Sequence, residues 1–210
     1  MYKIIATTLL LVACLDLRAQ SLMDLLKAMT SSSSTEETTV STAPLTSTSL
    51  VGKWNYQELA VGLSDDSSLK GFAGDAVLSQ VSGMISSVAT NAGITSGIFT
   101  AKFNSNRTID FVVNGEGGRK ANGSYYINTQ QSTILISIGE ISDIEIGALS
   151  ADVTLYDDGS VTLLFDADTL VAIADKIESI TENSQYKTVR ALVTKFDGLL
   201  LGFKLMINDQ

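Results

Sequence analysis

The sequence predicts an α+β domain built on an antiparallel, mostly meandering β-barrel of about eight or nine strands. Three observations predict it. Short segments with apolar residues at alternate positions succeed one another, separated by turn residues, as in antiparallel sheets. One stretch with an apolar period of 3.6 follows the first strand, and two more precede the last strand. The closing strand, residues 199–207, would then seal the barrel and leave no exposed sheet edge.

The first credible strand covers residues 51–59 and carries the only tryptophan of the chain. Alternation places Gly52, Trp54 and Tyr56 on one face of this strand. Residues 67–93 then form a helical region, because their apolar residues, Phe72 and Met84 among them, follow a helical period. The pattern therefore predicts a helix between the first two strands, packed over a barrel end or along its wall.

The central part of the chain is a run of short strands with turn residues between them. We predict strands over 98–103, 108–113, 123–128, 133–138, 141–146, 151–156 and 161–165. Tyr125 and Tyr126 point to opposite faces of one strand, so one of them should enter the barrel. Two helices then follow, marked by apolar residues over 170–180 and 186–196, with Asp197-Gly198 as a C-cap.

The N-terminus reads as an export signal. Lys3 and a short apolar run lead to two competing cleavage sites. Cleavage after Ala19 would define a signal peptide over 1–19, whereas the segment ending in Cys14 resembles a lipobox that would make Cys14 the lipidated N-terminus. Residues 20–49, rich in Ser and Thr, read as a tether, and residues 50–208 as the folded domain. We expect the mature protein to leave the cytoplasm, as a periplasmic or outer-membrane-associated species.

Composition excludes several chemistries. The chain has no histidine, and Cys14 is its only cysteine, so no disulfide and no Ser-His-Asp or Cys-His arrangement can form. We therefore expect no metal site, no cofactor and no enzymatic activity. The net charge of −9 opposes binding to nucleic acid. A membrane would be contacted only through a lipid on Cys14.

The acidic residues have structural interpretations. Asp166 or Asp168 is expected to cap a helix, because the rest of a calcium-binding loop is missing. Asp157-Asp158-Gly159 is typical of a hairpin turn. Glu140, Asp143 and Glu145 are expected on a solvated strand face, although paired carboxylates are also what a glycoside hydrolase uses.

Three short motifs carry a resemblance to a known family. Val51-Gly-Lys-Trp-Asn-Tyr56, Phe165-Asp-Ala-Asp168 and Leu201-Gly-Phe-Lys-Leu205 resemble an uncharacterised lipocalin-like domain family of secreted Bacteroidetes proteins. The resemblance implies a lipocalin-like barrel from the envelope of a Gram-negative bacterium, with no assigned activity. It also implies that Gly52 and Trp54 lie at the closed end of the barrel, with Lys204 as the candidate for the basic residue that crosses the tryptophan.

Two functions are compatible with these patterns. The first is binding of a small apolar ligand in the barrel or at its mouth, with Tyr56, Phe72, Met84 and Tyr125 as candidate ligand-binding residues. The second is a protein-interaction or inhibitor module that keeps a filled barrel and presents its loops to an envelope protein. A carboxylate-based hydrolase is a third and weaker alternative.

Overall fold

The chain folds into a closed antiparallel barrel of eight strands, which confirms the predicted fold. The computed structural model describes residues 41–64, 74–91, 94–114, 119–141, 144–176, 181–182 and 184–208. Each strand pairs with the next along the chain, and the last pairs with the first, so the meander closes. The barrel strands are β2 (Gly52–Leu63), β3 (Phe99–Phe103), β4 (Thr108–Val113), β5 (Arg119–Asn128), β6 (Thr133–Ile141), β7 (Ile144–Tyr156), β8 (Ser160–Asp166) and β9 (Leu199–Ile207).

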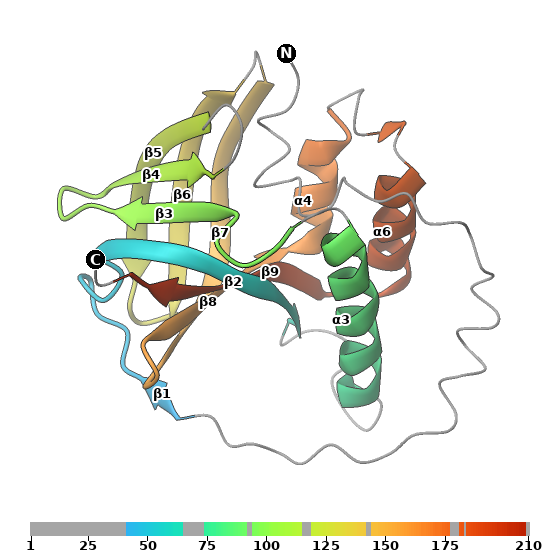
Figure 1. Ribbon diagram of the computed structural model, residues 1–210, viewed down its shortest axis with the longest axis horizontal. Coiled ribbons are helices and arrows are strands. Elements are labelled where there is room, and N and C mark those ends of the chain that lie inside the picture. The colour runs from blue at the N-terminus through green and yellow to red at the C-terminus, as the bar shows by residue number, and fades with distance from the viewer. Residues whose placement is uncertain are drawn as a thin grey trace.

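The helices lie where the sequence predicts them. One helix, α3 (Gly74–Asn91), separates β2 from β3, while α4 (Ala167–Ala174) and α6 (Ser184–Lys195) precede β9. The three stand beside one another on one side of the barrel, and α3 contacts both β2 and α6 (Figure 1). We call the barrel end where β2 finishes at Leu63 the helix end, and the end where β2 begins at Gly52 the hairpin end. No helix in the described part of the chain is long and apolar enough to cross a membrane.

Strand β2 continues beyond its predicted end at residue 59, and a bulge within it changes which residues face the core. The register with β9 shifts between Tyr56 and Glu58. Before the shift the buried side chains are Trp54 and Tyr56. After it, odd-numbered residues face the core and pair with the inward side chains of β9, namely Leu59, Val61 and Leu63. One extra residue in a strand has this effect, since side chains alternate between faces.

The domain begins inside the segment that the sequence predicts as a tether. Thr42–Ala43 form β1, which pairs with Tyr156 and Leu155 at the end of β7. This pairing uses backbone groups, so the Ser- and Thr-rich composition gives no sign of it. The predicted signal, the lipidation candidate Cys14 and the candidate ligand residue Phe72 lie outside the described residues.

The predicted caps and turns have their expected roles. Asp166, rather than Asp168, caps α4, because its Oδ1 accepts a hydrogen bond from the Thr169 amide at 2.7 Å. Gly198 follows α6 with φ of +71°, a left-handed conformation that glycine adopts without a steric penalty. Asp158 accepts a 2.8 Å hydrogen bond from the Ser160 amide in the β7–β8 turn.

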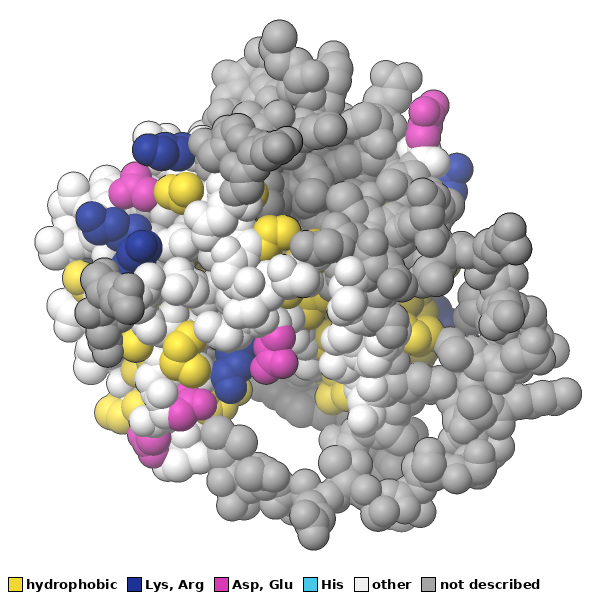
Figure 2. All heavy atoms as spheres, viewed as in Figure 1, with side chains coloured by type: hydrophobic (Ala, Val, Ile, Leu, Met, Phe, Trp, Pro, Cys, Tyr) yellow, Lys and Arg dark blue, Asp and Glu magenta, His cyan; other side chains and the backbone are white. Residues whose placement is uncertain are grey.

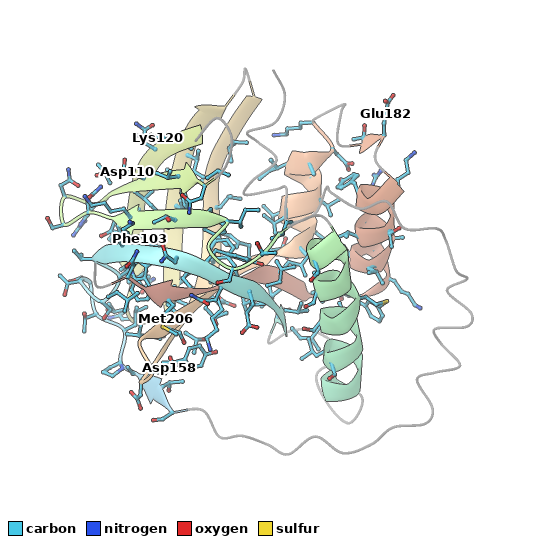
Figure 3. All side chains as sticks on the ribbon, viewed as in Figure 1. Phe103, Asp110, Lys120, Asp158, Glu182 and Met206 are labelled. Carbon is cyan, nitrogen blue, oxygen red and sulfur yellow. The ribbon has the colours of Figure 1, made fainter. Side chains whose placement is uncertain are left out.

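The outer surface of the barrel is largely polar, because the side chains that alternate with the buried ones along each strand are mostly polar. Figure 2 shows Lys, Arg, Asp and Glu side chains gathered over the strands on the left of the molecule. Asp110 of β4 and Lys120 of β5 project from this same side (Figure 3). The large apolar side chains exposed among the described residues are Val51, Ile207, Tyr126, which is 55% exposed, and Leu135, its cross-strand partner.

Candidate functional site

The hairpin half of the barrel lumen is a packed floor. Trp54 is only 1% exposed, and its Nε1–H donates to the Leu50 carbonyl at 2.8 Å. Tyr125 enters the lumen, its ring meets Phe103 edge-on at 5.1 Å, and its hydroxyl donates to the Asn104 carbonyl at 2.9 Å. Tyr125 therefore contributes to the floor of the barrel, and its polar atom is already used.

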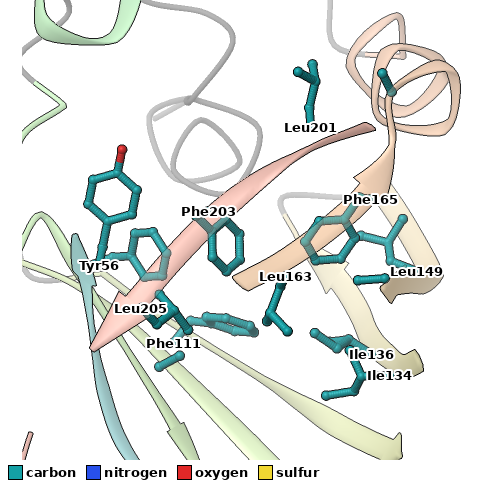
Figure 4. Packing of buried hydrophobic residues seen from close by; sticks show 14 of the residues in the cluster. Tyr56, Phe111, Ile134, Ile136, Leu149, Leu163, Phe165, Leu201, Phe203 and Leu205 are labelled. Atoms are coloured by element: carbon teal, nitrogen blue, oxygen red, sulfur yellow. The ribbon is translucent and has the colours of Figure 1, made fainter. Parts of the chain in front are cut away.

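A chain of aromatic rings crosses the middle of the lumen. Tyr56 lies 5.1 Å from Phe99, and Phe99 meets Phe203 edge-on at 5.2 Å. Phe165 continues the chain at 5.7 Å from Phe203. Figure 4 shows Tyr56, Phe203 and Phe165 together with aliphatic residues of the core. Ring centroids at these separations are in favourable contact, so the rings stabilise the barrel as core residues do.

The Tyr56 hydroxyl differs from every other buried polar ring atom described. The residue is 2% exposed, yet no hydrogen-bond partner of the hydroxyl occurs among the described residues. By contrast, Tyr125 donates to a carbonyl, and Tyr186 donates to the Asp175 carboxylate at 2.7 Å and contacts the Val171 carbonyl at 3.1 Å. In Figure 4 the Tyr56 hydroxyl points away from Leu205, toward the end of β9 that carries Leu201. It is therefore directed to the helix end.

Burial strengthens the preference of this hydroxyl for its neutral form. Desolvation, with a smaller contribution from the Glu58 charge, raises the pKa of Tyr56 to about 12. The phenol is consequently neutral and a hydrogen-bond donor under physiological conditions. A buried donor without an acceptor costs about 1–3 kcal/mol, so such a group calls for an explanation.

Met84 lies in the helix layer. It is partly buried on α3 and packs against the main core, as do the fully buried Val81 and Ile85 of the same helix. The helix and its candidate residue thus belong to the same end of the barrel as the Tyr56 hydroxyl.

Lys204 does not cross Trp54. Its side chain lies on the outer face, because Phe203 and Leu205 face the core. There Nζ lies 5.4 Å from the centre of the Tyr156 ring and 3.7 Å from Asp158 Oδ2. The barrel wall separates it from Trp54, so the pairing implied by the resemblance is wrong.

A surface groove that the sequence analysis missed lies outside the barrel. Its volume is about 560 Å³ and it runs over β2–β5. The polar residues that line it are Lys53, Thr100, Lys102, Asp110, Asn114, Lys120 and Asn122. The sequence does show charged residues at alternate positions of the neighbouring strands, which indicates an exposed face. Only the strand register brings the charged residues of different strands together in one groove. No group of three or more carboxylates that could hold a metal ion occurs in the described ranges.

Comparison with known protein families identifies the domain. The family model described as a lipocalin-like domain (DUF4923) matches residues 22–206, and no curated protein matches the chain. The matched region covers all eight barrel strands and the three helices, and it begins within the predicted tether.

Proposed function

The chain belongs to the DUF4923 family of lipocalin-like domains, and from this premise we propose that it binds a small, mainly apolar ligand at the helix end of its barrel. The lining of the lumen is aromatic and aliphatic, which favours an apolar ligand body. The proposal assigns no catalysis, because the chain has no histidine to act as a general base.

The observation that carries the proposal is the Tyr56 hydroxyl, buried, neutral and without an acceptor among the described residues. A ligand that places one acceptor oxygen at this hydroxyl would recover a hydrogen bond inside an apolar lumen. Such bonds determine orientation and specificity, while the apolar body supplies most of the affinity. The ligand class is therefore an apolar molecule with a carbonyl, ether or hydroxyl oxygen near one end.

The test is extraction of purified native protein followed by mass spectrometry, on the wild type and on two matched variants. Tyr56→Phe keeps the ring and removes the unpartnered hydroxyl, so it should carry several-fold less ligand while unfolding no earlier than the wild type. Tyr125→Phe removes the bond to Asn104 and should lose about 1 kcal/mol of stability while keeping the ligand. Empty wild-type extracts, or equal ligand content in Tyr56→Phe, would refute the proposal.

A second candidate function is a protein-interaction module with a filled barrel. The packed floor and the aromatic chain favour it, since small barrels are often solid. Empty extracts, no thermal shift with a panel of apolar compounds, and a protein that co-purifies in stoichiometric amount would support this alternative.

We also propose that the protein is exported and acts in the envelope, on the basis of its N-terminal sequence. Mass spectrometry of the mature N-terminus in the native host tests this. A chain starting at Gln20 supports a signal peptide, and a lipid-modified Cys14 supports a lipoprotein. An intact Met1 would contradict both.

A further inference from the structure

The groove over β2–β5 carries an excess of positive charge in an acidic protein. The ammonium groups of Lys53, Lys102 and Lys120 line it, against a single carboxylate, Asp110. The whole chain has 14 Lys and Arg residues against 23 Asp and Glu, so such a cluster is not expected from composition. The feature therefore depends on where the fold places these side chains.

Strand register puts two of the lysines directly opposite each other. Lys53 of β2 is the Cα partner of Lys102 of β3. Like charges at such positions destabilise a sheet, because the side chains extend from backbones only about 5 Å apart. The ion pairs described involve Arg190 and Lys204, and none of the three groove lysines takes part in one. On its other side Lys102 faces Asp110 of β4, with which it forms no ion pair in the described part of the chain, so this carboxylate offsets only part of the Lys53–Lys102 repulsion.

The polar floor of the groove is held in place by hydrogen bonds. Thr100 is 7% exposed, and its hydroxyl donates to Asn55 Oδ1 at 3.2 Å. Asn114 Nδ2 donates to the Gly97 carbonyl at 2.7 Å. Asp110 accepts from Asn104 Nδ2 at 2.8 Å, so its carboxylate is turned to a neighbour on its own hairpin. The lysines, in contrast, are left with free donor capacity above an ordered floor.

From this juxtaposition we propose that the groove binds a small organic anion with two or more phosphate or carboxylate groups. Lysines provide compact positive charges that accept any oxyanion geometry. Lys53 and Lys102 would hold one anionic group, and Lys120, two strands away, would hold the other. The volume of about 560 Å³ fits a small molecule. This site is separate from the lumen and does not depend on the proposed apolar ligand.

Isothermal titration of the full-length protein with pyrophosphate and with citrate, in about 20 mM salt, tests the proposal. We expect saturable binding that weakens steeply as salt is raised. Lys53→Gln and Lys102→Gln should each reduce affinity about three- to tenfold, as expected for the loss of one exposed charge contact. Lys53→Gln should also melt no earlier than the wild type, because it removes the Lys53–Lys102 repulsion and leaves Lys102 opposite Asp110. Tyr56→Phe should bind both anions normally.

Lys187→Gln on α6 is the matched control, because it removes one exposed lysine charge far from the groove. Unchanged affinity in this control, with the loss confined to the groove variants, supports a local site. Equal losses in Lys187→Gln and Lys102→Gln would mean that only net charge matters and would overturn the proposal. The absence of saturable binding to either anion at low salt would overturn it as well.

Discussion

Trp54 is the residue on which the barrel floor most depends. Its indole is fully buried and its N–H is satisfied by the Leu50 carbonyl. Trp54→Ala should therefore lower the free energy of unfolding by about 3–5 kcal/mol, measured by urea denaturation followed by circular dichroism. Lys204→Ala, which removes the cation beside the exposed side of Tyr156, should cost only about 0.5–1 kcal/mol. Comparable losses in the two variants would contradict the burial of Trp54.

Gly202 is a residue for which no side chain fits. A Cβ built there would lie 1.7 Å from the Leu163 carbonyl oxygen, which belongs to the backbone of β8. Gly202→Ala must push β9 and β8 apart and should lower stability by about 1–3 kcal/mol or more in thermal or urea unfolding. Gly139→Ala on β6 is the control, since no atom lies within 4 Å of its Cβ. It should be neutral or slightly stabilising, and a similar loss in both variants would refute the steric account.

At the residue scale, the sequence predicts the position of a side chain best where burial or capping depends on a few neighbouring residues. Trp54 was expected to be buried, and it is. Alternation and capping preferences narrowed the lumen tyrosine and the helix cap to a pair of residues each, and the structure selects Tyr125 over Tyr126 and Asp166 over Asp168. The predicted contact between Lys204 and Trp54 was wrong because it came from a family resemblance. Alternation in β9 places Lys204 on the outer face, whereas Trp54 of β2 is buried inside the barrel. The groove lysines could not be grouped from sequence, since Lys53 and Lys102 meet only through the β2–β3 register.

At the scale of elements, the β7–β8 hairpin contains an acid-sensitive turn. Hydrogen bonds from the Ser160 hydroxyl and amide, aided by Lys204, lower the pKa of Asp158 below its usual value. A carboxyl group whose pKa is lowered on folding stabilises the protein above its unfolded-state pKa of about 3.9, and that contribution is lost as pH falls through the folded-state value. Asp158→Asn should therefore melt earlier than the wild type at pH 6, and the difference should shrink below about pH 4.

Asp157→Asn is the control for this turn. It removes one carboxylate charge at the preceding residue and leaves Asp158, which accepts the Ser160 hydrogen bonds, in place. Its melting-temperature difference from the wild type should stay small across the same pH range. If the Asp158→Asn difference persists undiminished at pH 3, the stabilising role of the ionised carboxylate is wrong.

Element boundaries show what the sequence could not predict. Helices α3, α4 and α6 were found from their 3.6-residue periods, and the β7–β8 turn from Asp158-Gly159. The extension of β2 to Leu63 was missed, because the bulge after Tyr56 breaks simple alternation. Strand β1 was missed because a two-residue pairing leaves no pattern in a Ser- and Thr-rich segment.

For the whole molecule, the two ends of the barrel differ in their lining. The hairpin half is a packed floor around Trp54 and Tyr125, and the helix half carries the Tyr56 hydroxyl, which has no hydrogen-bond partner among the described residues. The outer groove adds a charged surface that is chemically unlike the lumen. Closure of the sheet was predictable from the closing strand. The different lining of the two barrel ends was not, because it depends on which polar atoms find hydrogen-bond partners in three dimensions.

The most direct test of the lumen ligand is a crystal structure of protein purified from its native host without denaturation. The account predicts elongated non-protein density at the helix end, with one polar atom about 2.8 Å from the Tyr56 hydroxyl oxygen. A single water at that hydroxyl, with side chains closing the space around it, would contradict the proposed ligand-binding function.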